Sequence, residues 1–315
     1  MEFLELLQRE KQIALTHKHE IGMGPPALSQ ELLDAVERKV LDLAYATASP
    51  SQKLDLYLPP RQNGPAPVIL HFHGGAFRMG DKRDINAVPM LYGLCRGYAV
   101  VSAEYRKSGE ARFPAMVYDA KAAVRWIYAH AEEYGLDSSR IAVWGPSSGG
   151  WLSSFVAVTN GESAFEDRSM GWSDAPSRVH ACVDWCGPCG GFLNMDPAFE
   201  HSGSGVADHS GPDSPESLFL GAHIVEVPEL VQLACPMSHV KADAPPFLIV
   251  HGEIDQVVPL EQSLDFCARI RQVAGEERAR LHIHKGGLHH GAAWYLEESV
   301  IQMALDFLDE SLGRS

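Results

Sequence analysis

The sequence predicts an α/β domain in which helices cover both faces of a mostly parallel sheet. The first observation is that apolar, strand-like runs alternate with segments of helical periodicity from residue 53 to the end of the chain. The second is composition: of 315 residues, 45% are hydrophobic and 21% charged, as in folded globular proteins. We therefore expect residues 46–315 to form one α/β domain, preceded by a helical N-terminal cap segment at residues 1–45.

The N-terminal segment is expected to contain two helices. Residues 1–15 (MEFLELLQREKQIAL) and 29–43 (SQELLDAVERKVLDL) space their apolar residues helically, and the glycines and prolines of residues 22–26 separate them. Charged residues interrupt the segment, so it does not have the apolar core of a signal peptide. No stretch reaches the roughly 18 uncharged apolar residues of a membrane-spanning helix. We expect a cytoplasmic protein with no membrane partner.

The first half of the α/β region contains strands of two kinds. Residues 53–59 (KLDLYLP) alternate in polarity, as a half-exposed strand does. Residues 67–73 (PVILHFH) and 98–106 (YAVVSAEYR) are nearly continuous apolar runs, which indicate strands buried on both faces. Residues 113–135 have helical spacing and end at a glycine, and residues 140–145 (RIAVWG) return to strand.

The second half continues the alternation. We expect strands at residues 179–187, 245–252 and 279–285, and helices at 260–275 and 294–312.

Two stretches do not fit this alternation. Residues 160–178 and 190–240 are rich in Gly, Ser, Pro and Asp, which is typical of long loops with short helices. Long loops inside an α/β sheet are often functional, so we expect lid-like insertions there, the alternative being plain linkers.

The charge balance argues against several classes of partner. Lys and Arg total 26 against 41 Asp and Glu, a formal net charge of −15, which repels nucleic-acid phosphates and anionic lipids. We expect no nucleic-acid or membrane partner, and the sequence leaves homo-oligomerisation open. The six cysteines are few for this length and several lie in apolar runs, so disulfides are not expected.

The strongest chemical motif is Gly145-Pro146-Ser147-Ser148-Gly149, which follows an apolar strand and opens a helix of small residues. This is a G-x-S-x-G pattern in a strand–turn–helix setting, where a sharp turn exposes the serine hydroxyl and the glycines let neighbouring backbone pass closely. The helix also directs its first N–H groups toward the place where an oxyanion forms on that serine. Ser147 is therefore the candidate nucleophile.

A second motif lies at the end of an upstream buried strand, where Gly74 and Gly75 follow His73. Paired glycines at this place let backbone amides face a site, as an oxyanion hole requires. An ordinary glycine turn is the alternative, and the serine motif favours the oxyanion hole.

The serine requires a base and an acid that orients it. Asp255 follows the strand of residues 245–252, and His289 and His290 follow the strand of residues 279–285. We favour His290 over His289 because a glycine follows it directly, and Asp255 over its rival Glu253. The chain order Ser, acid, His is that of the α/β-hydrolases.

With these motifs in place, the chain resembles the hormone-sensitive-lipase-type branch of the α/β-hydrolases. Its second half is most similar to bacterial acetylxylan and feruloyl esterase-like proteins. The resemblance covers most of the chain and rests on LDLYLP, HFHGGAF, YAVVSAEYR, FPAMVYDAKAAVRWI, RIAVWGPSSGG, VDWCGP, DSPESLFLG, APPFLIVHGEIDQVVP and GLHHG. Two positions depart from the family pattern: Ser148 replaces the usual alanine or glycine, and Cys186 stands where relatives often carry tyrosine.

The resemblance implies an α/β-hydrolase fold and hydrolysis of small-molecule carboxylic esters without metal or cofactor. It implies Ser147 as nucleophile, Asp255 and His290 as its partners, and the amides of Gly74, Gly75 and Ser148 as the oxyanion hole. An arylformamidase-type amide hydrolase shares these motifs and stays an alternative. A non-catalytic hydrolase-fold binding protein is a second alternative, which the complete candidate triad disfavours.

Four large aromatic residues follow motifs or strand ends: Phe77, Trp151, Trp185 and Trp294. Ligands of open α/β sheets bind at the carboxyl edge, so these side chains are candidate substrate contacts, the alternative being that they fill the core. If they line an acyl pocket, space is limited, and we expect short acyl chains.

Cys182, Cys186 and Cys189 have the C-x3-C-x2-C spacing of one class of iron–sulfur site. Because Cys182 lies inside an expected strand, packing in the core is favoured over a cluster.

Overall fold

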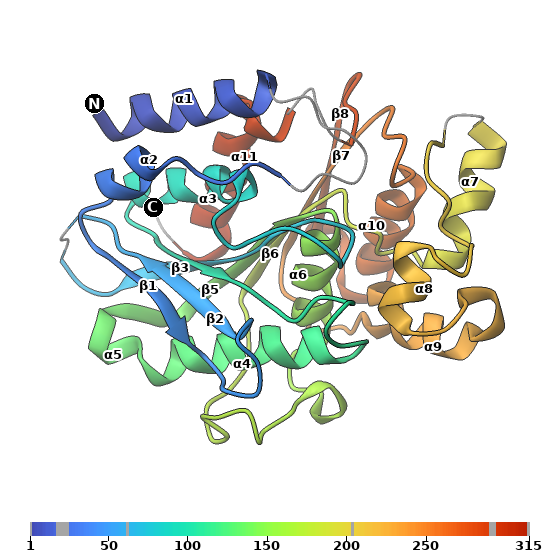
Figure 1. The fold of residues 1–315 in the computed structure, drawn as a ribbon, viewed down its shortest axis with the longest axis horizontal. Helices are drawn as coiled ribbons and strands as arrows, with labels where there is room; N and C mark the ends of the chain where they lie inside the picture. Colours follow the sequence, from blue (N-terminus) through green and yellow to red (C-terminus); the bar gives the residue numbers. More distant parts are fainter. Residues whose placement is uncertain (1, 17–24, 61–62, 203–204, 290–293, 314–315) are drawn as a thin grey trace.

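The computed structural model describes residues 2–16, 25–60, 63–202, 205–289 and 294–313. It contains one eight-stranded sheet with the order β1-β2-β4-β3-β5-β6-β7-β8 (Figure 1). The strands are β1 (Lys39–Ala44), β2 (Lys53–Tyr57), β3 (Ala66–Phe72), β4 (Ala99–Ala103), β5 (Leu136–Pro146), β6 (Ala181–Trp185), β7 (Phe247–Gly252) and β8 (Ala279–His284). The predicted α/β class and mostly parallel sheet are confirmed.

Strands β3 to β8 are parallel to one another, and β2 pairs antiparallel with both β1 and β4. The strands β3, β4, β6 and β7 and the second half of β5 are buried, because helices cover both faces of a parallel sheet. All parallel strands end at one edge, which gathers the turns that follow them.

Strand β1 differs from the helix predicted over residues 29–43. The helix α2 (Gln30–Ala35) stops early, and Lys39–Ala44 pairs with β2 across a bulge that lies between Val40 and Leu43. The apolar spacing of this segment suits a helix, but pairing with β2 satisfies its backbone groups and decides the outcome.

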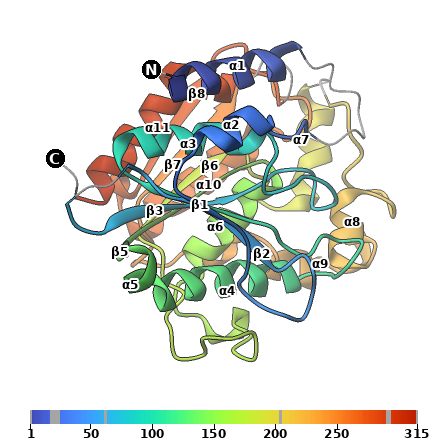
Figure 2. The same cartoon turned by 60° about the vertical axis from the view of Figure 1, so that its left-hand side comes forward.

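Helices form layers above and below the sheet (Figure 2). The longer ones are α1 (Glu2–Thr16), α4 (Ala115–Ala129), α6 (Ser148–Val158), α10 (Glu261–Ala274) and α11 (Glu298–Ser311). The shorter ones are α3 (Val88–Leu91), α5 (Ala131–Tyr134), α7 (Met195–Ser202), α8 (Pro215–Leu220) and α9 (Pro228–Leu233). Single 3-10 turns are η1 (Ile85–Ala87), η2 (Tyr92–Arg96), η3 (Ser163–Phe165), η4 (Phe192–Asn194), η5 (Ile224–Glu226), η6 (Pro236–His239), η7 (Glu276–Arg278) and η8 (Trp294–Leu296).

Two hydrophobic cores lie on opposite faces of the sheet. One is built with α4, α6 and α10, and the other with α1, α2, α3 and α11. Neighbouring strand residues alternate between them, as in β5, where Val143 belongs to the first core and Trp144 to the second.

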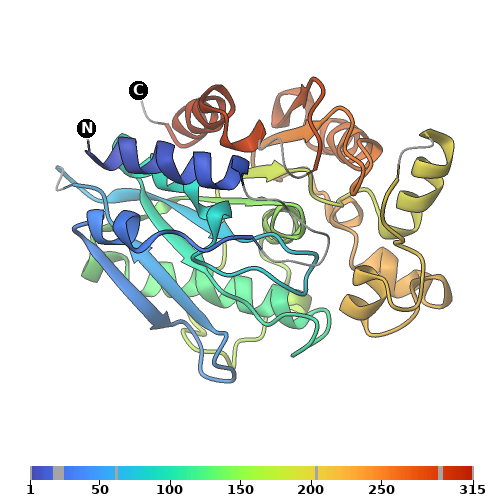
Figure 3. The same ribbon diagram turned by 45° about the horizontal axis from the view of Figure 1, so that its top comes forward.

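The two insertions lie at opposite ends of the parallel strands. Residues 160–178 connect the end of α6 to the start of β6, so they lie at the amino ends of the strands. Residues 190–240 follow β6 directly and form α7, α8 and α9, which gather at one end of the molecule (Figure 3). Only the second insertion therefore starts at the edge where a lid would act. Of the helices described, none is long and apolar enough to cross a membrane.

Candidate active site

Ser147 lies on a strained turn between β5 and α6. Its backbone has φ 54° and ψ −124°, a conformation that non-glycine residues rarely adopt. The turn also requires glycine at its flanks: a Cβ on Gly145 would lie 2.5 Å from Phe72 O, and one on Gly149 would lie 2.2 Å from the same atom. The hydroxyl is thereby presented at the carboxyl edge of the sheet, as the G-x-S-x-G motif predicts.

A continuous hydrogen-bond chain connects Ser147 to a carboxylate. The Oγ atom of Ser147 lies 2.9 Å from Nε2 of His289, and Nδ1 of His289 lies 2.7 Å from Oδ2 of Asp255. Because a carboxylate only accepts, Nδ1 carries the proton and Nε2 is left to accept from the serine hydroxyl. This orientation leaves the imidazole ready to remove the serine proton.

Asp255 is buried and fully hydrogen-bonded. Its Oδ1 accepts from the amides of Val257 and Val258 at 2.8 and 2.9 Å. Burial by itself would raise the pKa of this carboxyl, but the neighbouring His289 and His251 hold the pKa of Asp255 well below its usual range. The group is therefore an anion that can stabilise an imidazolium.

The histidine in this arrangement is His289, the residue that the sequence analysis ranked second. His290, which it favoured, lies outside the described residues. The choice between the two neighbours depends on which ring reaches both Ser147 and Asp255 in space, and His289 makes both contacts.

The glycine turn after β3 lies directly beside Ser147. A Cβ on Gly74 would lie 3.5 Å from the Cβ of Ser147. Within the described part of the chain, the amides of Gly74, Gly75 and Ser148 donate no hydrogen bond to backbone acceptors. Free N–H groups beside the serine are what an oxyanion hole requires.

A buried ion pair supports this turn. His73 Nδ1 donates to Gly74 O at 2.7 Å and Nε2 donates to Glu104 Oε1 at 2.8 Å, so the ring is an imidazolium. Burial opposes that charge, yet Glu104 raises the pKa of His73 above its ordinary value, and His73 and Lys107 lower the pKa of Glu104 to about 2 against the effect of burial. Tyr105 stacks on the His73 ring with centroids 4.4 Å apart. The sequence analysis did not identify this pair, because 31 residues separate its members.

Phe77 and Trp151 belong to one buried aromatic cluster near Ser147. Their rings meet edge to face with centroids 5.3 Å apart, and Phe77 stacks on Phe219 of α8 at 4.2 Å. The backbone amide of Trp151 donates to Ser147 O at 2.9 Å, so Trp151 lies one helical turn after the serine. The cluster brings the glycine turn, α6 and the second insertion together.

Trp185 and Trp294 pack in the core on the other face of the sheet. Their centroids are 5.9 Å apart, and Trp144 meets Trp185 edge to face at 5.0 Å. Both are at most 1% exposed, and Trp294 Nε1 donates to Leu288 O next to His289. The core-filling alternative describes their contacts better than substrate binding does.

The three closely spaced cysteines do not converge. Cys182 and Cys189 belong to one core and Cys186 to the other. Cys189 Sγ instead donates to Asp184 Oδ2 at 3.3 Å. Cys186, Asp255 and His289 form the one group of possible metal-binding atoms within 4.8 Å of one another among the described residues, and the latter two are already joined by a hydrogen bond.

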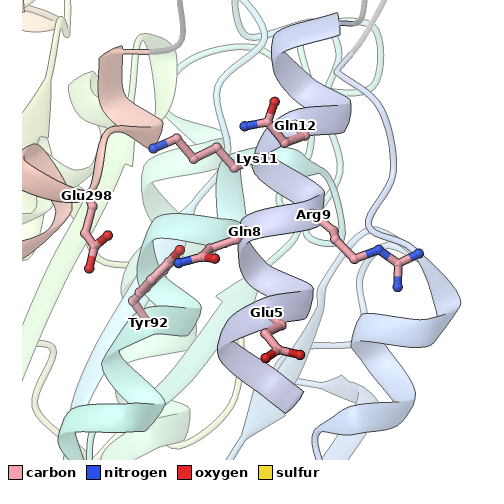
Figure 4. A pocket seen from close by; sticks show the side chains of 7 residues that line it. All are labelled: Glu5, Gln8, Arg9, Lys11, Gln12, Tyr92 and Glu298. Carbon is pink, nitrogen blue, oxygen red and sulfur yellow. The ribbon is translucent and has the colours of Figure 1, made fainter. Parts of the chain in front are cut away.

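A polar groove elsewhere on the surface has no such chemistry. It lies between α1, η2 and α11 and is lined by Glu5, Gln8, Tyr92 and Glu298 among others (Figure 4). None of its lining residues lies in the turn directly after a parallel strand. We therefore assign the candidate active site to Ser147 and its neighbours.

A family model described as BD-FAE matches residues 54–270. This chain belongs to the BD-FAE family. The match runs from β2 into α10 and includes Ser147, Asp255 and the glycine turn. Together with the sheet topology it confirms the α/β-hydrolase fold and the resemblance to esterases of the hormone-sensitive-lipase-like branch.

A probable carboxylic ester hydrolase of Mycobacterium tuberculosis, LipM, is 32% identical over 74% of this chain. The chain spans 52% to 62% of the length of LipM and of two further curated relatives, the esterases LipQ and LipC.

Two solved structures are similar over most of the chain. A bifunctional GH43-CE protein of Bacteroides eggerthii has 31% identity and a TM-score of 0.76, covering 87% of this chain and 35% of that one. A truncated carbohydrate esterase from gut microbiota has 29% identity and a TM-score of 0.76, covering 93% of this chain and all of that one, 100%.

Proposed function

We propose that this chain hydrolyses carboxylic esters through an acyl-enzyme, with Ser147 as nucleophile, His289 as general base and Asp255 as the acid that orients the base. The observation that carries the proposal is the hydrogen-bond chain from Ser147 through His289 to Asp255, at 2.9 and 2.7 Å. The esterase names of the relatives support it.

In the first step, Ser147 Oγ attacks the acyl carbon while His289 Nε2 takes its proton. Asp255 stabilises the resulting imidazolium, which then gives the proton to the leaving alcohol. Water attacks the acyl-enzyme by the same route, and the proton returns to Ser147 as the carboxylic acid leaves. No cofactor takes part in these steps.

The amides of Gly74, Gly75 and Ser148 would stabilise the tetrahedral oxyanion. They are free of backbone acceptors and lie at the turn beside Ser147 and at the start of α6. Loss of one such donor typically costs about 3 kcal/mol of transition-state stabilisation. The His73–Glu104 pair would keep this turn in place.

The substrates are small-molecule esters with short acyl chains, acetate to butyrate. The buried cluster of Phe77, Trp151 and Phe219 fills the space one turn from Ser147, and Phe192 joins it at 6.0 Å from both other phenyl rings. We therefore retain Phe77 and Trp151 as substrate contacts. Trp185 and Trp294 instead support the strand edge and the histidine loop.

Acyl groups on carbohydrates are a second candidate substrate class. The truncated structure similar to this chain is a carbohydrate esterase and matches it along its whole length. Release of acetate from acetylated xylo-oligosaccharides tests this class.

We further propose that residues 190–240 act as a lid. Two features of this insertion support its role: it starts at the carboxyl end of β6, and its Phe219 contacts Phe77. We also propose that the N-terminal segment covers part of the site.

The deciding experiment combines a fluorophosphonate probe with p-nitrophenyl acetate. Stoichiometric labelling of Ser147 that abolishes turnover supports the proposal, whereas turnover without labelling of Ser147 contradicts it. Comparing naphthyl acetate with N-formylkynurenine separates an esterase from an arylformamidase-type enzyme. A non-catalytic binding protein would turn over neither.

A further inference from the structure

A second histidine contacts the same carboxylate that binds His289. His251 Nε2 lies 3.3 Å from Oδ2 of Asp255, the oxygen that accepts from His289 Nδ1 at 2.7 Å. His251 lies in the buried strand β7, four residues before Asp255, and its side chain is 0% exposed. The carboxylate therefore lies between two imidazole rings.

The neighbours of His251 determine its tautomer. Its Nε2 lies 2.9 Å from the carbonyl oxygen of Val258, which can only accept, so Nε2 carries a proton. Its Nδ1 lies 2.6 Å from Oγ of Ser263, and a hydroxyl can donate to it. In the neutral ring, Ser263 therefore donates to Nδ1, and the Nε2–H group donates to Val258 O, while Asp255 Oδ2 lies 3.3 Å from the same nitrogen.

These contacts join His251 to the loop of residues 255–258 that carries Asp255. Val258 donates its amide to Asp255 Oδ1 and accepts from His251 at its carbonyl. Ser263 lies in the first turn of α10, so the ring is held between the buried strand β7 and a helix. The other titratable groups nearby are Asp184 and Cys186, on the neighbouring β6 and just after it.

We propose that His251, held by Ser263, is a positioning residue that keeps the Asp255 carboxylate in the orientation that His289 requires. This proposal rests on the proposed function of the triad. Without this ring, Oδ2 of Asp255 would lose its imidazole contact at 3.3 Å and Val258 O would lose its donor, so the loop of residues 255–258 would lose its attachment to β7. His289 would then be oriented less well for proton transfer.

The test measures ester hydrolysis by His251→Leu, Ser263→Ala and His251→Gln. We expect His251→Leu to lower kcat by about 10²-fold with KM nearly unchanged, because a small misorientation of a catalytic group costs about that factor. Ser263→Ala should lower kcat less, because it removes the hydroxyl that fixes the tautomer of His251 but keeps the imidazole ring in place. The amide N–H of His251→Gln can replace the Nε2 donor, so this variant should recover most of the lost kcat.

Thr159→Val is the matched control, because Thr159 is a buried hydroxyl that donates to Phe155 O far along α6 from Ser147. It should lose stability without a change in kcat. If His251→Leu and His251→Gln have the same kcat, or if kcat falls only in proportion to folded protein, the proposal is overturned.

A second readout does not depend on turnover. The proton between His289 Nδ1 and Asp255 should give a low-field proton resonance, which we expect to shift in His251→Leu and to return toward its wild-type position in His251→Gln. An unchanged resonance in folded His251→Leu would overturn the positioning role. Absence of ester hydrolysis by the wild-type protein, with the resonance still shifting, would count against the proposed function alone.

Discussion

Backbone strain is concentrated at the residues around Ser147. Six described non-glycine residues have positive φ, and four of them, Ala76, Phe77, Ser147 and Cys186, follow the carboxyl ends of β3, β5 and β6. Such conformations persist only where surrounding contacts enforce them. Here the amides of Ser147 and Cys186 donate to Trp185 O and Val250 O at 2.7 and 2.9 Å.

At the residue scale, the first prediction concerns the nucleophile. Ser147→Ala should fold normally and lose at least about 10³-fold in kcat, because only binding and the oxyanion hole would still contribute. Steady-state hydrolysis of p-nitrophenyl acetate measures the loss, and thermal unfolding checks the fold. Ser148→Ala is the matched control: it keeps its amide and should retain most activity. The reverse pattern would mean that the elbow has been assigned one position too early.

The second prediction distinguishes the two adjacent histidines. His289→Ala should be about as damaging as Ser147→Ala, since residues that act as one unit show non-additive losses. His290→Ala should keep the hydrogen-bond chain of Ser147, His289 and Asp255 and lose far less. The pH dependence of kcat/KM should show an acidic limb, because an imidazolium cannot accept the serine proton. If His290→Ala inactivates the enzyme and His289→Ala does not, the general base is His290.

At the scale of elements, the elbow depends on how closely α6 approaches β3. The third prediction is that Gly149→Ala destabilises the fold by about 3 kcal/mol or more, because its Cβ would meet backbone atoms of Phe72 and His73 at 2.2 to 2.8 Å, and rigid backbone cannot yield. Gly109→Ala is the control, since nothing lies within 4 Å of its Cβ. Chemical denaturation measures both, and equal stability of the two variants would contradict the close approach.

The fourth prediction concerns the His73–Glu104 pair that connects β3 to β4. The pKa of His73 is raised from 6.5, so its contribution to stability is complete below that pH and is lost as the pH rises through the higher folded value. The pKa of Glu104 is lowered from 4.5 to about 2, so its contribution is complete above 4.5 and is lost toward pH 2. The pair therefore stabilises the fold most between these reference values.

Accordingly, Glu104→Gln should cost about 3 kcal/mol at pH 5.5, because it leaves a buried imidazolium without its counter-charge. The cost should be smaller at pH 9, where the unfolded histidine is neutral. Denaturant unfolding at both pH values measures this, and a loss that is equal at the two pH values would argue against a charged pair.

At the scale of the whole molecule, the site exists because five parallel strands end together. The turns after β3, β5, β7 and β8 supply Gly74, Ser147, Asp255 and His289, and the insertion after β6 adds α7, α8 and α9. The aromatic cluster joins three of these segments, which are well separated in the chain, through Phe77, Trp151 and Phe219.

The fifth prediction follows from that cluster. Wild-type kcat/KM should be greatest for acetate to butyrate esters, and Phe219→Ala should shift the maximum toward longer acyl chains by opening space beside Phe77. A series of p-nitrophenyl esters measures the preference. Tyr134→Ala is the control: Tyr134 ends α5 and stacks on Trp126, so its loss should leave the preference unchanged. A wild-type maximum at ten carbons or more would refute the short-acyl preference and leave the triad proposal intact.

Much of the fold and of the candidate site depends on residues that are close together in the chain and could therefore be predicted from the sequence. Buried apolar runs and helical spacing predict the parallel sheet, because strand and helix periodicities are local properties. The turns at Ser147 and Gly74 could be found because their backbone geometry requires glycines at fixed spacing. Asp255 could be found because it directly follows a buried strand.

Only the tertiary structure decided the relations between distant residues. Residues 39–44 became a strand because β2 offers it hydrogen-bond partners. Trp185 and Trp294 are buried in a hydrophobic core because of the sheet face on which they lie. His289 contacts Ser147 and Asp255, and His251 contacts the same carboxylate, because the fold brings these distant residues together. A linear pattern specifies which side chains follow a strand, but not which of two neighbours meets a partner contributed by another strand.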